Sequence, residues 1–313
     1  MPARIIAFAL GTAVGGAIVG ASVAWEKDSS SSSVSKRTAL VISPTATAVV
    51  DPNEILKYGT PLISADIGNR KAFISLYDRR MRNPAWVAEV LTAKSLERKN
   101  GDRKNSEFYE DAEIPLKFRT KLSDYSRSGY DRGHQAPAAD AKISQEAMNE
   151  TFILSNICPQ TPQLNHWAHF EDFCRRLTAQ YQTVRIITGP LYLPKQDQDG
   201  KWRVSYEVIG TPPNVAVPTH FYKIIVADNG ETEQVAVAAF VMPNSTVSIP
   251  DSTPLTDFQM PLEAIERAAG LEFLNKLPVS KRKDLCKETS CTVLVRQFAN
   301  SNRGIKQLPG PKL

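Results

Sequence analysis

The sequence predicts an α+β fold with a largely antiparallel central sheet flanked by helices. Two observations lead to this class: several short runs rich in β-branched and aromatic residues, and helical patterns that lie between them without strict βαβ alternation. The chain has 313 residues, of which 42% are hydrophobic and 23% are charged. It can therefore bury a sizeable core, and its composition is not that of a disordered protein.

The N-terminus begins with a long apolar run. Residues 5–25 contain no charged side chain, and a helix of this length spans a bilayer. A retained membrane anchor, a cleaved secretory signal and part of an organelle-targeting leader all fit this pattern, and its length favours the anchor. We therefore expect residues 1–28 to be an anchor or targeting segment, residues 29–50 a serine-rich linker, and residues 51–313 the folded domain.

Strand-like runs begin at residue 72. Residues 72–77 and 86–91 are separated by a polar, turn-prone stretch, and together they predict a β-hairpin. Further strands are expected at residues 152–154, 184–187, 204–209, 221–226 and 235–241.

Two helices are expected among these strands. Apolar residues at a spacing of three and four predict a helix of about four turns. They are Trp167, Phe170, Cys174, Leu177 and Tyr181. A second helix is expected to begin at Pro261, which suits a first helical turn, and to end at Gly270.

Residues 128–137, with the sequence SGYDRGHQAP, contain the side chains best suited to chemistry. His134 can exchange a proton near neutral pH, and Arg132 precedes it by two positions. In an extended segment both side chains point to the same face, so Arg132 can hold an anionic oxygen while His134 takes a proton from a nucleophile. This pattern favours phosphate chemistry. The net charge of +5 permits a polyanionic partner without identifying one.

The same residues carry a family resemblance. Asp131-Arg132-Gly133-His134, residues 155–160 (SNICPQ) and Leu164-Asn165 resemble the signature of the DNA/RNA non-specific endonucleases, which have a ββα-metal active site. The chain is similar in particular to the mitochondrial endonuclease G type and its fungal members, in order over about residues 51–300. The resemblance implies a ββα-metal nuclease fold and hydrolysis of DNA and RNA to 5′-phosphate products.

Roles for three side chains follow from this resemblance. His134 is expected to be the general base that activates the attacking water. Arg132 is expected to bind or position the phosphate, although it also suits a surface ion pair with Asp131. Arg103 resembles an upstream arginine that the family directs at the scissile phosphate.

The resemblance also implies a divalent cation, Mg²⁺ or alternatively Mn²⁺, with Asn165 as its protein ligand. Asn156 and Glu171 are expected to support the site. Asn165 and Glu171 are six residues apart, which places them about 240° apart around a helix, whereas the family spacing of about eight gives about 80°. Either Asn165 lies in the loop before the helix or the metal site is altered. Asparagine at this point also suits a helix N-cap.

Family members are homodimers, and the resemblance places them in mitochondria. We therefore expect a homodimer held by its N-terminal helix in the mitochondrial inner membrane, with the nuclease domain in the intermembrane space. Roles in mitochondrial nucleic-acid turnover and programmed cell death are implied in the same way. The six-residue spacing indicates that the segment between Gln160 and Trp167 is shorter than in the family. This supports a second interpretation, a catalytically weakened, membrane-tethered relative that binds nucleic acid.

The remaining histidines and the cysteines suggest no further metal centre. His166 and His169 are three residues apart, but no third ligand at a suitable spacing is evident, so solvated or interfacial side chains are expected. The four cysteines show no CxxC pattern. Cys286 and Cys291 can form a disulfide in an oxidising compartment, and buried free thiols are expected for the other two.

Overall fold

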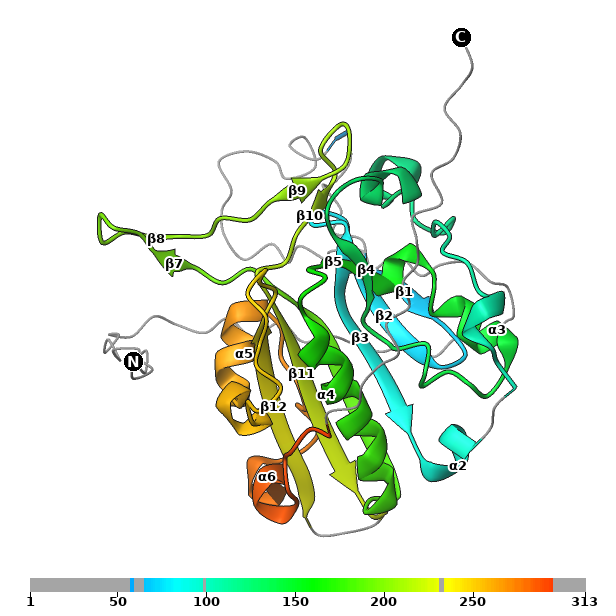
Figure 1. The fold of residues 1–313 in the computed structure, drawn as a ribbon, viewed down its shortest axis with the longest axis vertical. Helices are drawn as coiled ribbons and strands as arrows, with labels where there is room; N and C mark the ends of the chain where they lie inside the picture. Colours follow the sequence, from blue (N-terminus) through cyan, green and yellow to red (C-terminus); the bar gives the residue numbers. More distant parts are fainter. Residues whose placement is uncertain (1–56, 59–64, 98–99, 231–233, 295–313) are drawn as a thin grey trace. The chain divides into compact units, whose positions relative to one another are not determined.

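The fold was analysed in a computed structural model that describes residues 57–58, 65–97, 100–230 and 234–294 (Figure 1). The chain divides into two units, residues 1–64 and 65–313, and the elements below belong to the second. The predicted anchor (residues 5–25) and the predicted linker lie outside the described residues. Within the described ranges, no helix combines the length and apolar character needed to cross a membrane.

A seven-stranded sheet forms the centre of the second unit, and its strand order is β1-β2-β3-β6-β11-β12-β13. All neighbouring pairs are antiparallel except β12 and β13, which confirms the predicted α+β fold. The strands are β1 (Asp66–Asn69), β2 (Phe73–Asp78), β3 (Asn83–Leu91), β6 (Thr183–Leu191), β11 (His220–Asp228), β12 (Val235–Pro243) and β13 (Arg282–Asp284).

The predicted hairpin is formed by β2 and β3. The carboxylate of Asp78 accepts hydrogen bonds from the backbone N–H groups of Arg80 and Met81, which closes the turn. The strands predicted at residues 184–187, 221–226 and 235–241 are confirmed within β6, β11 and β12.

Two strand predictions differ from the structure. Residues 152–154 form no strand: Ile153 makes a single bridge with Tyr109, and a 3₁₀ helix, η4 (Leu154–Asn156), follows at once. These residues are apolar because they are buried beside the cleft described below. Of residues 204–209, only β9 (Val208–Ile209) is a strand, and it pairs with β10 (Val215–Ala216).

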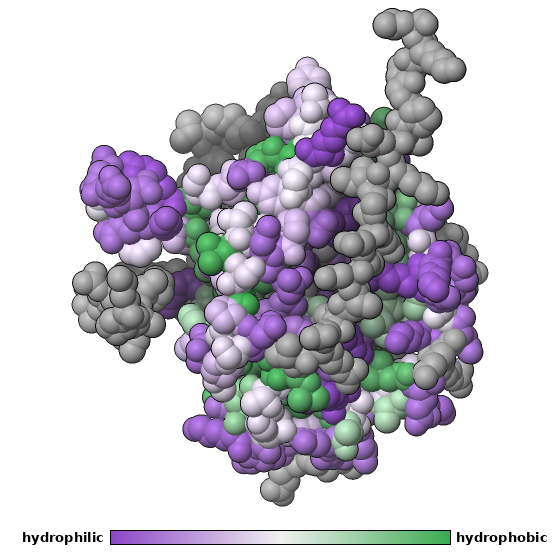
Figure 2. Space-filling view, viewed as in Figure 1, coloured by the Kyte–Doolittle hydropathy of each residue, from purple (hydrophilic) through white to green (hydrophobic). Residues whose placement is uncertain are grey.

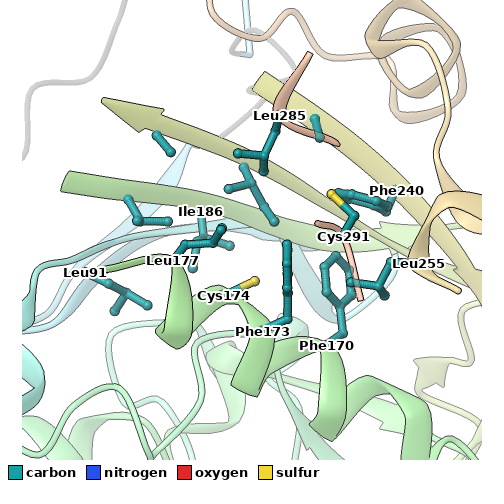
Figure 3. Close-up of a cluster of buried hydrophobic side chains, with 14 of the residues drawn as sticks. Leu91, Phe170, Phe173, Cys174, Leu177, Ile186, Phe240, Leu255, Leu285 and Cys291 are labelled. Atoms are coloured by element: carbon teal, nitrogen blue, oxygen red, sulfur yellow. The ribbon is translucent and has the colours of Figure 1, made fainter. Parts of the chain in front are cut away.

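Helix α4 (Asn165–Arg176) covers one face of the sheet, and Trp167, Phe170 and Cys174 of the predicted stripe lie on it. The helix is shorter than predicted: Leu177 lies in the 3₁₀ helix η5 (Leu177–Ala179), and Tyr181 follows it, although both still pack in the same cluster. Phe170 and Phe173 point from α4 into the largest buried cluster, where they meet residues of the sheet strands, including Phe240 (Figure 3). Helix α5 (Leu262–Ala269) packs on the opposite face through Ile265, beside Tyr222 and Ile224 of β11. The unit is therefore layered as helix, sheet and helix.

Helix α5 ends where predicted and begins one residue later than predicted. Pro261 is its N-cap residue, and Gly270 ends it in the left-handed conformation, with φ of 69°. This conformation suits glycine because it has no Cβ. The N–H of Gly270 donates to the carbonyl of Glu266 and closes the final turn.

Smaller elements surround the sheet. They are α2 (Ala93–Glu97), η1 (Arg103–Asn105), α3 (Gln145–Glu150), η5 (Leu177–Ala179), β7 (Lys195–Gln196), β8 (Trp202–Arg203) and α6 (Leu285–Glu288). Strands β7 and β8 form an arm that projects from the body in Figure 1, and its tip is hydrophilic in Figure 2. Cys286 of α6 and Cys291 form the disulfide that the sequence allowed, and Cys158 and Cys174 are buried free thiols, as expected.

Candidate active site

A short antiparallel pair of strands and one helix build the site. Strand β4 (Asp131–His134) pairs with β5 (Ile157–Gln160), and the chain then continues into α4. This β-β-α arrangement borders a cleft of about 600 Å³. Its lining residues are Arg103, Phe108, Asp131, Arg132, Gly133, His134, Pro137, Ala138, Ala139, Gln160, Trp167, Ala168 and Glu171.

Strand β4 places the central pair as the sequence predicted. Arg132 and His134 are two positions apart on an extended strand, and both line the cleft. Gly133 lies between them against the side chain of Gln160, the last residue of β5. A Cβ at Gly133 would lie 2.7 Å from the Cβ of Gln160, so only glycine fits at this position without a shift of Gln160.

The imidazole of His134 is 9% exposed and packs between two aromatic rings. Its ring centroid lies 5.3 Å from that of Phe108 and 4.7 Å from that of Phe152. Burial, together with the positive charges of Arg103 and Arg132, lowers the pKa of His134 to about 3, although a backbone hydrogen bond with Arg132 acts in the opposite direction. His134 is therefore neutral at pH 7, as a general base must be.

Two guanidinium groups border the same cleft. The Cζ atom of Arg132 lies 4.3 Å from the ring centroid of Phe108, and that of Arg103 lies 5.6 Å from the ring centroid of Phe152. Both arginines are exposed, so their N–H groups remain accessible to an anion while the aromatic rings orient the side chains. The ion pair between Arg132 and Asp131 that the sequence allowed is not formed in the described part of the chain.

Asn156 does not face the cleft but fixes the backbone next to His134. It is fully buried on η4. Its Nδ2 donates to the carbonyl oxygens of Ala136 (3.0 Å) and Thr151 (2.8 Å), and its Oδ1 accepts from the N–H of Ala136 (2.9 Å). Its two hydrogen bonds with Ala136 hold the loop that leaves β4, and the third holds the end of α3 at Thr151.

Glu171 projects into the cleft from α4, next to Ala168 and Trp167. Burial raises the pKa of Glu171 to about 7; nearby Lys223, Arg175 and Arg103 lower it, and Asp140 raises it further. The carboxyl group thus exchanges its proton close to neutral pH.

Asn165, the predicted metal ligand, is the first residue of α4. It is exposed and is not one of the residues that line the cleft. It does not lie in the preceding loop, and the N-cap position is occupied by Leu164. The six-residue spacing therefore keeps Asn165 and Glu171 on different sides of the helix, as their calculated angular separation indicates.

A divalent cation fits this cleft only in part. The carboxylate of Asp131 and the amide of Gln160 line it, and oxygen donors of this kind, supplemented by water, are those that Mg²⁺ takes. Asn165, the predicted anchor, is not among the residues that line the cleft. Among the residues that the structure describes, no group of three or more His, Cys, Asp or Glu side chains could hold a metal ion.

Several lining residues have no predicted role, among them Phe108, Gln160 and Trp167. Gln160 belongs to the SNICPQ segment, and the spacing of Trp167 indicates only its place in the apolar stripe. Phe108 lies in an irregular polar stretch, and no signal in the sequence predicts its contact with His134. His166 and His169, expected to be solvated or interfacial, are instead buried, at 1% and 3% exposed.

Comparisons with known proteins show which family the chain resembles. Residues 51–280 match the model of a family described as DNA/RNA non-specific endonuclease. A "Mitochondrial nuclease" from Saccharomyces cerevisiae is 56% identical over 275 residues, covering 84% of this chain and 83% of the relative. "Nuclease 1, mitochondrial" from Schizosaccharomyces pombe is 53% identical over 253 residues, covering 79% of this chain and 78% of that protein.

A solved structure is also similar. The crystal structure of an EndoG/EndoGI complex, determined to explain the mechanism of EndoG inhibition, contains a chain that superposes with a TM-score of 0.67. The sequences are 41% identical, and the match covers 74% of this chain and 97% of that chain. The β4-β5-α4 unit and its cleft thus belong to a fold that is already represented among solved nucleases.

Proposed function

The chain belongs to the DNA/RNA non-specific endonuclease family, and we propose that it hydrolyses phosphodiester bonds within DNA and RNA in the cleft beside β4. The observation that carries this proposal is the placement of Arg132 and His134 on one wall of that cleft. The polar groups of the cleft suit phosphate oxygens rather than base edges. Contacts of this kind carry little sequence information, which accounts for an enzyme that does not select its substrate by sequence or sugar.

In the proposed reaction, His134 acts on a water molecule beside the scissile phosphate. The Nε2 atom of His134 is buried and has no hydrogen-bond partner among the described residues, and we assign it the role of accepting the proton. As the water oxygen bonds to phosphorus, its proton passes to this nitrogen, and the bond from phosphorus to the 3′-oxygen breaks. The leaving oxygen takes up a proton from solvent water, so the products carry a 5′-phosphate and a 3′-hydroxyl.

Arg132 and Arg103 bind the phosphate in this proposal. Their positive charges contribute to the low pKa of His134, which makes the imidazole a weak base in the free protein. A bound phosphate would neutralise these charges and raise the pKa of His134 towards its ordinary value. Substrate binding would therefore strengthen the base at the moment it is needed, which is an electrostatic reason for placing both arginines beside it.

The remaining predicted residues have supporting roles. Asn156 holds the backbone at Ala136, two residues after His134, and so fixes the direction of the imidazole. Glu171 places an ionisable carboxyl group on the wall formed by α4.

We propose Mg²⁺ as the working cation, with Mn²⁺ as a substitute, because family resemblance implies a metal-dependent nuclease. When bound, such an ion neutralises charge on the leaving 3′-oxygen. None of the steps assigned above to His134, Arg132 and Arg103 depends on Asn165.

A second candidate function is favoured by the position of Asn165 outside the cleft lining. A chain whose metal anchor is displaced would still bind nucleic acid through its arginines while cleaving it poorly. Retention of the Arg132 and His134 pair favours the enzyme, since a binding protein has no evident need of a neutral histidine beside a phosphate site.

Cellular placement and assembly follow from resemblance. Relatives named as mitochondrial support a mitochondrial protein. We propose that residues 5–25 anchor it in the inner membrane with the nuclease domain in the intermembrane space, that it forms a homodimer, and that it acts in mitochondrial nucleic-acid turnover and programmed cell death.

End analysis of the products tests the proposed reaction. DNA and RNA oligonucleotides of one sequence, labelled at the 5′ end, would be incubated with the purified protein in Mg²⁺ and in EDTA. We expect fragments of both that end in a 3′-hydroxyl, formed only with Mg²⁺. Fragments that end in a 3′-phosphate would exclude the reaction, and binding of both nucleic acids without cleavage would favour the second candidate.

A further inference from the structure

A buried lysine lies beneath the wall of the cleft. Lys223 is in the middle of β11, on the face that α4 covers, and is 1% exposed. Its Nζ donates a 2.8 Å hydrogen bond to Oγ1 of Thr188, its cross-strand neighbour on β6. No ion pair of Lys223 is found within the described ranges. Burial of an ammonium without a paired carboxylate opposes folding, so its presence calls for a reason other than stability.

The ammonium contacts the helix that carries two residues of the cleft. Its Nζ lies 4.7 Å from the ring centroid of Trp167 and 5.9 Å from that of Phe170. Trp167 and Glu171 are four residues apart on α4, so they lie one above the other on the same face, and both line the cleft. Lys223 therefore supports the cleft wall from the side of the sheet.

Several other charges face this region, and their effects have opposite signs. Among the charged neighbours that lower the pKa of Glu171, Lys223 has the largest effect, ahead of Arg175 on α4 and Arg103 on η1. Asp140, in the loop after β4, raises the pKa of Glu171. Glu89 on β3 is buried nearby; burial and the charge of Asp140 raise its pKa well above the ordinary value, and Lys223 acts in the opposite direction.

We propose that Lys223 is a positioning residue for the nuclease reaction: its buried side chain holds Trp167 in the cleft wall and places a positive charge beneath the helix that carries Glu171. This inference rests on the proposed function, because it assigns Lys223 a purpose in the cleft where cleavage takes place. It also explains why an unpaired ammonium stands where an apolar residue would pack more favourably.

The test compares Lys223→Met, which keeps the aliphatic stem and removes the charge, with two matched variants. Lys223→Arg keeps the charge, and Thr188→Val removes the hydrogen bond without changing the charge. We expect Lys223→Met to unfold at the same temperature as the wild type or higher, since it removes a buried charge. Its cleavage rate is expected to fall, and the acidic limb of its kcat/KM profile to move up by about one pH unit, equivalent to about a tenfold loss on that limb.

The controls separate electrostatics from packing. Lys223→Arg and Thr188→Val are expected to keep the acidic limb within a few tenths of a pH unit of its wild-type position, and Lys223→Met should shift nothing further in a Glu171→Gln background. A folded Lys223→Met protein with the wild-type pH profile would overturn the proposal. So would an equal shift in Thr188→Val, because that shift would come from packing.

A direct titration of Glu171 tests the proposal even if the protein does not cleave or if Lys223→Met does not fold. Carboxyl ¹³C NMR of Glu171, assigned with Glu171→Gln, measures its ionisation in the wild-type protein and in Lys223→Met without any need for cleavage. A protein that cleaves nothing would contradict the proposed function, whereas this titration would still test the role of Lys223. If Lys223→Met fails to fold, a Glu171 carboxyl group that stays protonated well above pH 7 in the wild type overturns the inference.

Discussion

The neutral, buried imidazole of His134 predicts a specific loss of stability in acid. Its pKa falls from an ordinary 6.5 to about 3 in the folded protein, mainly because burial disfavours the charged form. Below pH 6.5, His134 becomes protonated in the unfolded chain but stays neutral in the folded chain. Stability from this group is therefore complete above pH 6.5 and is lost as the pH falls towards 3.

The size of the effect follows from the two pKa values. Between pH 7 and about pH 4.5, the difference is worth about 2.5 kcal/mol in the free energy of unfolding, at about 1.4 kcal/mol per pH unit over the titrating range. A non-titrating variant of similar shape, His134→Asn, lacks this contribution. Its absolute stability will differ from that of the wild type, so the informative quantity is the change in stability with pH.

Urea unfolding of both proteins, followed by tryptophan fluorescence in EDTA at a series of pH values, measures this change. We expect the wild type to lose about 2.5 kcal/mol more than His134→Asn between pH 7 and about pH 4.5. All other acid-sensitive groups are common to both proteins and cancel in the comparison. Equal losses in the two proteins would show that His134 titrates normally and that it is not held neutral by burial and the two arginines.

Two further substitutions test the scaffold of the site. Asn156→Ala removes three buried hydrogen bonds and leaves the backbone groups of Ala136 and Thr151 without these partners. We expect the free energy of unfolding in urea to fall by about 3 kcal/mol. The control, Asn100→Ala at an exposed position, should lower it by less than about 0.5 kcal/mol. Equal effects of the two would contradict the assigned role. Gly133→Ala adds a Cβ against Gln160 and should reduce stability by about 1–3 kcal/mol together with plasmid cleavage; a fully active and stable variant would show that Gln160 moves without consequence.

Much of the fold could be predicted because its signals are local. The hairpin of β2 and β3 and the helix ends at Pro261 and Gly270 depend on turn chemistry and on the spacing of apolar residues, which a sequence displays directly. Residues 152–154 were misassigned because a short apolar run does not distinguish a strand from a buried turn.

Some features of the candidate site follow from local sequence, whereas others depend on contacts between distant residues. Arg132 and His134 were predictable because two positions on one strand must share a face. Their contacts with Phe108, and the lysine beneath α4, arise from residues distant in sequence, so no local pattern reveals them. The position of Asn165 followed from counting residues along the helix, and the structure agrees with that count.

Cleavage of supercoiled plasmid tests the central claim most directly. The purified protein and its His134→Ala variant would be compared in Mg²⁺, with EDTA as the control for metal dependence and the free energy of unfolding as the control for folding. We predict nicking by the wild type in Mg²⁺ alone and a rate at least about a hundredfold lower in the variant. A folded His134→Ala protein that cuts as fast as the wild type, or a wild type that binds the plasmid and cuts it in neither Mg²⁺ nor Mn²⁺, would contradict the account.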